Sequence, residues 1–408
     1  MISVDEARNR ILDVLRPVGR ETIPALQGLG RVVAQDLTSR RTQPPADVSA
    51  MDGYAVRSRD VSDVPTTLKQ VMEIAAGGQA KRAIGPGECA RIFTGAPLPE
   101  GADAIVIQED TRADGTDITV LEGVPPARYV RKAGLDFREG DLLIRAGDTL
   151  NARAIGLVAA MNRPWIDVFR KPRVAILATG DEIVLPGEDI GPSQIVSSNG
   201  PALAACVAAC GGEATLLPVA HDDAETLKDI AASAAGFDLL LTTGGASVGK
   251  HDLVGSALTE IGLSLDFWKI AMRPGKPLMF GMFGDGDRPV PMLGLPGNPV
   301  SAIVCFILFG VPALRKLGGQ TDCSLPIENA RLGAPLPEND NREEYLRGTL
   351  RVGEDGVPVA TGFDKQDSSM LHRLCAADCL IRRAARASPA AAGETVEIIR
   401  FSNVVGAL

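Results

Sequence analysis

Three glycine-rich turns, each following an apolar run, carry the residues best suited to hold an anion. Glycines let backbone N–H groups approach a phosphate closely, and a helix beginning at Pro299 adds the positive end of its dipole. One such turn alone can be an ordinary tight turn, but three in one domain predict an anionic ligand. The turns are Thr179-Gly180-Asp181-Glu182, Thr242-Thr243-Gly244-Gly245-Ala246-Ser247-Val248-Gly249 and Leu295-Pro296-Gly297-Asn298-Pro299.

Carboxylates stand beside the same turns, at Glu182, Asp222 and Asp252. Acidic groups repel a phosphate unless a cation lies between them, so their presence indicates Mg²⁺. The alternative is structural, since Asp222 can open a helix and Asp252 can close a turn. The sequence favours Glu182 and Asp252 as metal ligands.

The segment from Trp268 to Pro277 is the densest local source of positive charge. Lys269, Arg273 and Lys276 could neutralise an oxyanion or a phosphate. A solvated basic turn is the alternative. Proline and glycine restrain this segment just before the next strand, which favours a preformed cradle.

Other polar residues have no generic chemistry. Asp52 in a glycine turn, Thr94 before a glycine and Asp136 could all be structural. The spacing of His372, Cys375 and Cys379 could bring them near one helical face, but no fourth ligand follows, so packing is favoured over a metal site. The chain has 3 histidines, none with a convincing catalytic partner.

The turns need a scaffold, and residues 168–318 supply one. Apolar runs such as RVAILATG and FDLLLTTGG alternate with helical segments, which is typical of a doubly wound α/β domain with a buried parallel sheet. Asn199 is expected to cap one helix, and a last helix runs from Pro299 to Leu317. In such a sheet ligands bind beyond the carboxyl ends of the strands.

The regions on either side of the predicted α/β domain have other sequence patterns. Residues 44–133 show short strands broken by turns and predict a β-rich subdomain, while 1–43 and 134–167 predict an elongated helical region. Ser3 and Glu6 form a predicted capping box at the first helix. Residues 319–408 are strand-rich and predict a C-terminal β-barrel domain.

Composition excludes several classes. The 408 residues carry a net charge of −9, so no global field favours nucleic acid or an acidic membrane. The apolar stretch Val300–Leu314 is shorter than the roughly 20 residues of a membrane span. The chain start lacks signal-peptide character, and 7 cysteines without a CxxC pair favour reduced thiols, so a cytoplasmic location is expected.

The motifs, in this order, resemble the molybdopterin molybdenumtransferase family, which includes MoeA and the E domain of gephyrin. The match runs almost end to end through DVSAMDGYAVR, RIFTGAPLPEGADAIVIQED, ATGDE, IVSSN, TTGGASVGKHD, FWKIAMRPGKP, GLPGNPVSA, REEYLRG and KQDSSML. The chain departs at Arg273, where the family often has Lys, and at Lys250, where Glu is usual.

The resemblance implies four subdomains and a homodimer whose cleft is shared between subunits. It implies that molybdate is inserted into adenylylated molybdopterin with Mg²⁺, releasing AMP and molybdenum cofactor. It assigns Asp52, Thr94 and Asp136 to the cleft from the partner chain, with Glu182, Asp222 and Asp252 as acidic cleft residues. The implied substrate-binding residues are Thr179, Gly180, Ser198, Asn199, Gly244, Gly245, Ser247, Gly249, Lys269, Arg273, Lys276, Pro296, Gly297, Asn298, Pro299, Ser301 and Ser368, or Ser369 beside it.

Two other functions stay open. A molybdopterin adenylyltransferase would use the same α/β module one step earlier, and such an enzyme is also a possible partner; the extra flanking regions argue against the chain being one itself. A scaffold protein could keep the fold without turnover, although Asp52, Glu182 and Lys269 argue against lost catalysis.

Overall fold

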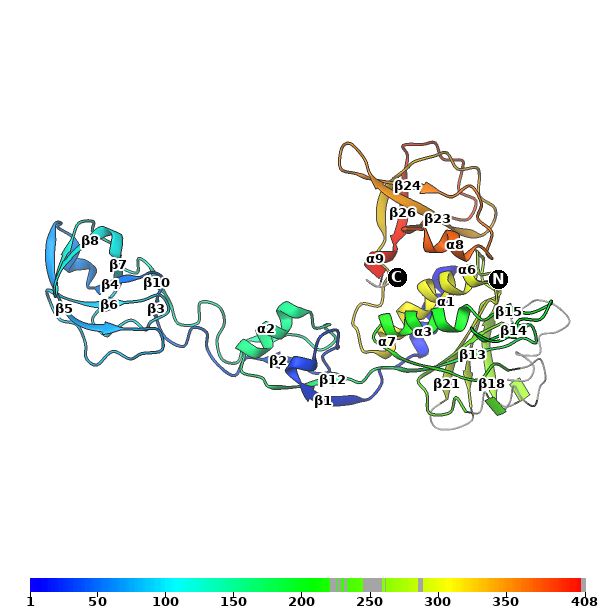
Figure 1. Ribbon diagram of the computed structural model, residues 1–408, viewed down its shortest axis with the longest axis horizontal. Helices are drawn as coiled ribbons and strands as arrows, with labels where there is room; N and C mark the ends of the chain where they lie inside the picture. Colours follow the sequence, from blue (N-terminus) through cyan, green and yellow to red (C-terminus); the bar gives the residue numbers. More distant parts are fainter. Residues whose placement is uncertain are drawn as a thin grey trace.

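The computed structural model describes residues 1–220, 225, 229–230, 233–244, 259–260, 262–284 and 289–404. The molecule is elongated (Figure 1). A β-rich body and a smaller middle body form an arm, and the α/β domain and a C-terminal β domain lie together at its other end.

The α/β domain is built on a six-stranded sheet with the strand order β16-β13-β17-β21-β20-β18. The first four strands pair in parallel, and β20 and β18 are antiparallel. Both β17 and β21 are buried throughout, as their unbroken apolar runs predict. The predicted doubly wound domain is therefore confirmed. Its strands are β13 (Arg173–Ala178), β16 (Glu213–Leu216), β17 (Leu239–Thr243), β18 (Leu263–Trp268), β20 (Met279–Phe283) and β21 (Val290–Leu295).

Apolar helices cover this sheet. The alanine-rich helix α3 (Asn199–Ala209) ends at Gly211, whose φ of +81° lets the chain turn back onto the sheet. The segment Pro299–Leu317 consists of α6 (Pro299–Cys305), one π-helical turn, η4 (Phe306–Gly310), and α7 (Val311–Leu317). By length and composition it could cross a membrane, but it is 89% buried inside the protein. It is the core helix that the sequence predicts.

The first helix belongs to the same core. In α1 (Val4–Val14) the Ser3 side chain accepts a hydrogen bond from the Glu6 N–H, as expected of a cap. Its buried residues Val4, Ala7 and Ile11 pack in one cluster with the sheet and the Pro299–Leu317 segment. The expected elongated region began at residue 1, but in the structure α1 packs with the α/β domain.

The arm consists of two bodies, and each has paired strands of its own. The middle body contains β1 (Arg20–Pro24), β2 (Leu37–Thr38), α2 (Ala152–Ala160), β11 (Leu142–Ile144) and β12 (Trp165–Phe169). The β-rich body has a six-stranded sheet of order β7-β4-β6-β5-β9-β8. These strands are β4 (Gly53–Val56), β5 (Thr66–Ile74), β6 (Glu88–Ile92), β7 (Ala104–Ile107), β8 (Thr111–Asp114) and β9 (Asp117–Val120).

The C-terminal domain is a closed β-barrel, as predicted, because β23 pairs with both β24 and β25. One short strand from the α/β domain, β19 (Met272–Arg273), pairs in parallel with β23 and joins the two domains. The other barrel strands are β22 (Glu328–Leu332), β23 (Glu343–Val352), β24 (Pro358–Gly362), β25 (Cys379–Arg383) and β26 (Thr395–Arg400).

The position of α1 gives a stability prediction. Ile11 is 1% exposed, so Ile11→Ala leaves a cavity in the core and should lower the free energy of unfolding by about 2–5 kcal/mol. Val14 in the same helix is 46% exposed, so Val14→Ala should change it by no more than about 0.5 kcal/mol. Urea denaturation measures both, and an unchanged midpoint for Ile11→Ala would contradict this packing.

Candidate functional site

A pocket of about 610 Å³ lies where the parallel strands of the α/β domain end. Residues that follow β13, β17 and β21 line it together, because parallel strands bring their carboxyl ends to one edge. We call it the strand-end pocket. Its lining consists of Ala178, Thr179, Glu182, Ile183, Ile195, Val196, Ser197, Ser198, Asn199, Thr243, Gly244, Pro277, Pro296, Gly297, Asn298, Pro299 and Ser369.

Asn199 links two of the strand-end turns. Its Nδ2 donates to Thr243 Oγ1 over 2.8 Å and to the carbonyl oxygen of Gly297 over 2.7 Å. The helix begins at Asn199 itself, and Ser198 occupies the cap position. The prediction that Asn199 caps α3 is therefore wrong: its amide holds the turns after β17 and β21 together instead.

The floor of the pocket contains buried oxygen atoms that lack partners. Among the described lining residues, Thr179 Oγ1 and Asn199 Oδ1 make no hydrogen bond. The two donor bonds of Asn199 fix its amide nitrogen, because a backbone carbonyl can only accept. Asn199 Oδ1 is therefore an acceptor, and a ligand with N–H or O–H groups can satisfy it.

Glycine is required at the turn after β17. Gly244 has φ of +99°, and a Cβ there would lie 2.2 Å from the backbone oxygen of Thr179. A side chain at this position would therefore push the first two strand-end turns apart. The close approach explains why the sequence has glycine here.

The third strand-end turn also contacts the C-terminal domain. Asn298 Nδ2 donates to Ser368 Oγ over 2.9 Å, and the N–H of Val300 donates to the Ser368 carbonyl oxygen over 3.1 Å. Ser369 lines the pocket, and Ser301 is buried in α6. The KQDSSML motif thus reaches the α/β domain, as the resemblance implied.

The three predicted cations do not line the described part of this pocket. The Lys269 ammonium lies 4.5 Å from the centre of the Trp268 ring, and Lys269 has φ of +82°. Lys276 directly precedes the lining residue Pro277. Among the described lining residues, Glu182 is the ionisable one. The described lining is therefore polar and acidic rather than basic.

Several predicted site residues lie outside the described residues, namely Asp222, Gly245, Ser247, Gly249 and Asp252. The predicted Mg²⁺ ligand pair therefore has one described member, Glu182. Within the described residues, no three His, Cys, Asp or Glu side chains gather as a metal site. Cys379, from the cluster with His372 and Cys375, is buried and lies 3.6 Å from the Gly348 carbonyl oxygen.

Two predicted residues of the β-rich body meet each other. Asp52 Oδ1 accepts hydrogen bonds from the N–H and from the hydroxyl of Thr94, each over 2.8 Å. These bonds, the backbone one first, lower the pKa of Asp52. Asp136 is bound elsewhere, with its N–H on the Gln43 carbonyl oxygen. The β-rich body lies at the far end of the arm from the strand-end pocket (Figure 1).

A second cavity of about 240 Å³ contains a cation that the sequence analysis did not select. We call it the arginine pocket; it is lined by Arg273, Pro274, Glu344, Tyr345, Leu346, Arg347 and Gln366. Arg347 is 0% exposed, and among the described residues its Nε and Nη1 have no hydrogen-bond partner. Its Nη2 donates to the Asp367 carbonyl oxygen over 3.1 Å. β23 reads EEYLRGTLRV, with four charged residues, so its pattern does not single out Arg347.

Arg347 is a buried charge with free donors. Burial lowers its pKa, and the charges of Asp367 and Glu344 oppose that shift. A guanidinium nevertheless stays protonated in proteins, so its unused N–H groups favour an anion in the cavity.

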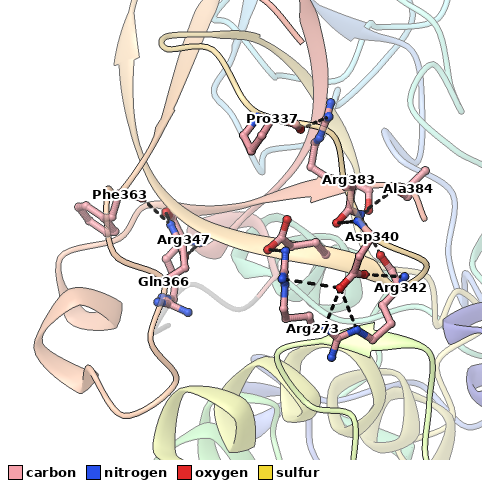
Figure 2. A network of polar contacts seen from close by, with 11 residues as sticks. Arg273, Pro337, Asp340, Arg342, Arg347, Phe363, Gln366, Arg383 and Ala384 are labelled. Atoms are coloured by element: carbon pink, nitrogen blue, oxygen red, sulfur yellow. Dashed lines mark hydrogen bonds and ion pairs between the residues drawn. The ribbon is translucent and has the colours of Figure 1, made fainter. Parts of the chain in front are cut away.

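Arg273 also lines the arginine pocket, but it is already paired. Its Nη2 forms an ion pair with Glu344, and its Nη1 lies 3.7 Å from Asp340 Oδ2. Arg342 holds Asp340 from the other side at 2.6 Å (Figure 2). Arg273 therefore connects the α/β domain to the barrel as well as facing the cavity.

The same two segments of the chain contribute residues to both cavities. In the segment 274–277, Pro274 lines the arginine pocket and Pro277 lines the strand-end pocket. In the segment 366–369, Gln366 lines the first and Ser369 the second. Two ligands, one in each cavity, would therefore contact the same two segments of the chain.

Comparison with known proteins covers nearly the whole chain. Residues 2–162 match the model of the MoeA N-terminal region (domain I and II), and 329–401 match the MoeA C-terminal region (domain IV). Between them, residues 175–316 match a probable molybdopterin binding domain. The strand-end pocket lies mostly in this central match, and Arg347 lies in the last one.

Curated relatives and solved structures agree with the family models. The molybdopterin molybdenumtransferase of Nostoc sp. is 40% identical over 329 residues, covering 79% of this chain and 75% of that protein. The molybdopterin molybdenumtransferase of Haemophilus influenzae is 32% identical and is covered along 100% of both chains. The molybdopterin biosynthesis MoeA protein of Pyrococcus horikoshii superposes with a TM-score of 0.84 at 33% identity, covering 98% of this chain and 99% of that one. The chain therefore belongs to the MoeA family of molybdopterin molybdenumtransferases.

Proposed function

We propose that this protein inserts molybdenum from molybdate into adenylylated molybdopterin, releasing AMP and molybdenum cofactor. The observation that carries the proposal is a pair of cavities to which the segments 274–277 and 366–369 both contribute, one polar and one lined by a buried, partly unpaired guanidinium. An insertase must hold an organic ligand and an oxyanion side by side. The names of the curated relatives support the same activity.

The organic ligand belongs in the strand-end pocket. Its volume of about 610 Å³ suits a nucleotide-sized molecule, and its floor offers Thr179 Oγ1 and Asn199 Oδ1 to the edge of a heterocycle. Ile183 and Ile195 line the same pocket and give a ring an apolar surface. Uncharged groups would therefore orient the heterocycle. Glu182 is the one charged residue of the described lining.

Molybdate belongs in the arginine pocket. It is a small tetrahedral dianion, and the fork of donors on a guanidinium matches such oxygens well. Arg347 has Nε and Nη1 to offer, and Pro274 and Gln366 enclose the same cavity. The short step into the strand-end pocket would bring molybdenum to the sulfur atoms of the ligand.

Mg²⁺ would be held at the strand ends. Among the described lining residues, Glu182 provides a hard carboxylate oxygen of the kind that Mg²⁺ prefers. We assign Asp252 as its second carboxylate, from outside the described residues. The ion would neutralise the diphosphate that the acidic lining otherwise repels. Glu182 would also orient the diphosphate for cleavage.

The distance between the β-rich body and the strand-end pocket supports a homodimer. Figure 1 places the β-rich body and the α/β domain at opposite ends of the molecule, so Asp52 and Thr94 are remote from the strand ends of their own subunit. A second copy could bring them over the cleft, and the ionised Asp52 carboxylate would then face the substrate. We place the dimer in the cytoplasm, receiving its substrate from a molybdopterin adenylyltransferase.

Release of AMP tests the activity directly. Purified protein with adenylylated molybdopterin and Mg²⁺ should release AMP only when molybdate is added, and the product should activate an apo-molybdoenzyme. Glu182→Ala should lower the rate by on the order of 100-fold, because it removes a group that orients the metal and the diphosphate. ATP consumption with molybdopterin would identify an adenylyltransferase instead, and tight binding without turnover would identify a scaffold.

Arg347 gives a prediction in which stability and function move in opposite directions. Arg347→Met removes a buried charge and should raise the free energy of unfolding by about 1–3 kcal/mol. Molybdate binding, measured by isothermal titration calorimetry, should be lost. Arg351→Met, at an exposed position of the same strand, should leave binding unchanged. Retained binding in Arg347→Met would show that the oxyanion lies elsewhere.

The Asp52–Thr94 pair gives a prediction about ionisation. Thr94→Val removes the hydroxyl donor but keeps the backbone N–H, so the pKa of Asp52 should rise and remain below its ordinary value. Thr94→Ser keeps the hydroxyl and should keep the low pKa. A carboxyl ¹³C NMR titration measures this value, and an unchanged pKa in Thr94→Val would argue against the hydroxyl contact.

A further inference from the structure

The arginine pocket contains an acid that its proposed use does not explain. Glu344 lines the cavity with a side chain only 13% exposed, beside the ion-paired Arg273 and the unpaired Arg347. A carboxylate accepts hydrogen bonds and offers none, so it repels an anion that enters the cavity. A pocket built only to retain an oxyanion would not need this residue.

A purely structural role for Glu344 does not account for it. The α/β domain and the barrel are also joined by the pairing of β19 with β23, in which the Glu343 N–H donates to the Ala271 carbonyl oxygen over 2.9 Å. Asp340 provides Arg273 with a second carboxylate at 3.7 Å. Figure 2 shows Arg273 beside Asp340 and Arg342, apart from Arg347 and Gln366. The domains therefore have contacts that do not depend on Glu344.

The charges around the cavity suggest another role. Arg273 and Arg347 contribute two positive charges and Glu344 one negative charge, so the lining carries 2 − 1 = +1. A bound dianion leaves this group with a net charge of −1. Without Glu344 the lining would carry +2, so the same dianion would meet one more unit of positive charge. In a buried site, an uncompensated charge weakens binding.

We propose that Glu344 sets the strength of oxyanion binding, keeping a dianion weakly held so that it can pass to the strand-end pocket. This inference rests on the proposed use of the arginine pocket for molybdate. By its charge, Glu344 limits how long the oxyanion stays bound beside Arg347. The ion pair with Arg273 keeps the carboxylate at the cavity wall.

Molybdate binding to the full chain tests the proposal by isothermal titration calorimetry. Glu344→Gln keeps the size of the side chain and removes its charge, so the Kd for molybdate should fall on the order of tenfold. Molybdate-dependent AMP release at saturating molybdate should become slower in the same variant, because the oxyanion is held longer. Glu344→Asp keeps the charge and should bind within about twofold of the wild-type chain. Glu354→Gln, at an exposed acid of the same barrel outside the cavity, should change neither measurement.

The outcomes separate this inference from the proposed function. If Glu344→Gln binds molybdate as the wild-type chain does, or more weakly, the proposal is overturned. Weaker binding together with a lower unfolding midpoint would identify Glu344 as a residue that docks the barrel. Binding that depends on Arg347 but not on Glu344 would overturn this inference alone, and no binding to the wild-type chain would overturn both.

Discussion

The parallel pairing of β13, β17 and β21 is the constraint on which the site depends. Parallel strands end at the same edge of a sheet, so the turns that follow them must meet. Two asparagine side chains hold this edge together. Asn199 joins the turns after β17 and β21. Asn298, in the turn after β21, bonds to Ser368 of the C-terminal domain. The pocket is thus formed by α/β-domain residues from Ala178 to Pro299 that meet at one edge of the sheet, and by Ser369 of the C-terminal segment.

The barrel adds a cavity that the α/β domain lacks. Arg273 leaves the α/β domain as part of β19, and Arg347 comes from the barrel strand that pairs with it. The charges at this boundary are balanced by Glu344 and Asp340, and Arg342 lowers the pKa of Asp340 through a direct hydrogen bond. Both domains contribute residues to the arginine pocket, so the pocket forms only when they dock.

The sequence predicted the scaffold better than the site. Apolar runs such as that of β17 mark buried strands because both faces are covered, and the glycines after them mark turns that approach closely. The role of Asn199 was missed because cap positions and ligand positions attract the same residue types. Arg347 was missed because it is one of four charged residues in β23, and its burial becomes evident only when its neighbours are known. The pairing of Arg273 with Glu344 was likewise invisible, since the two residues lie far apart in the chain.

The β-rich body has one further consequence, which concerns how the chain folds. Its two ends meet where β3 (Val48–Ser49) pairs with β10 (Val130–Arg131), so residues 48–131 close on themselves within one body. It has hydrophobic clusters of its own, around Val56 and Ile92. A segment with adjoining ends and a separate core costs its host little loop-closure entropy. During synthesis it can complete its sheet before the strands of the α/β domain have left the ribosome.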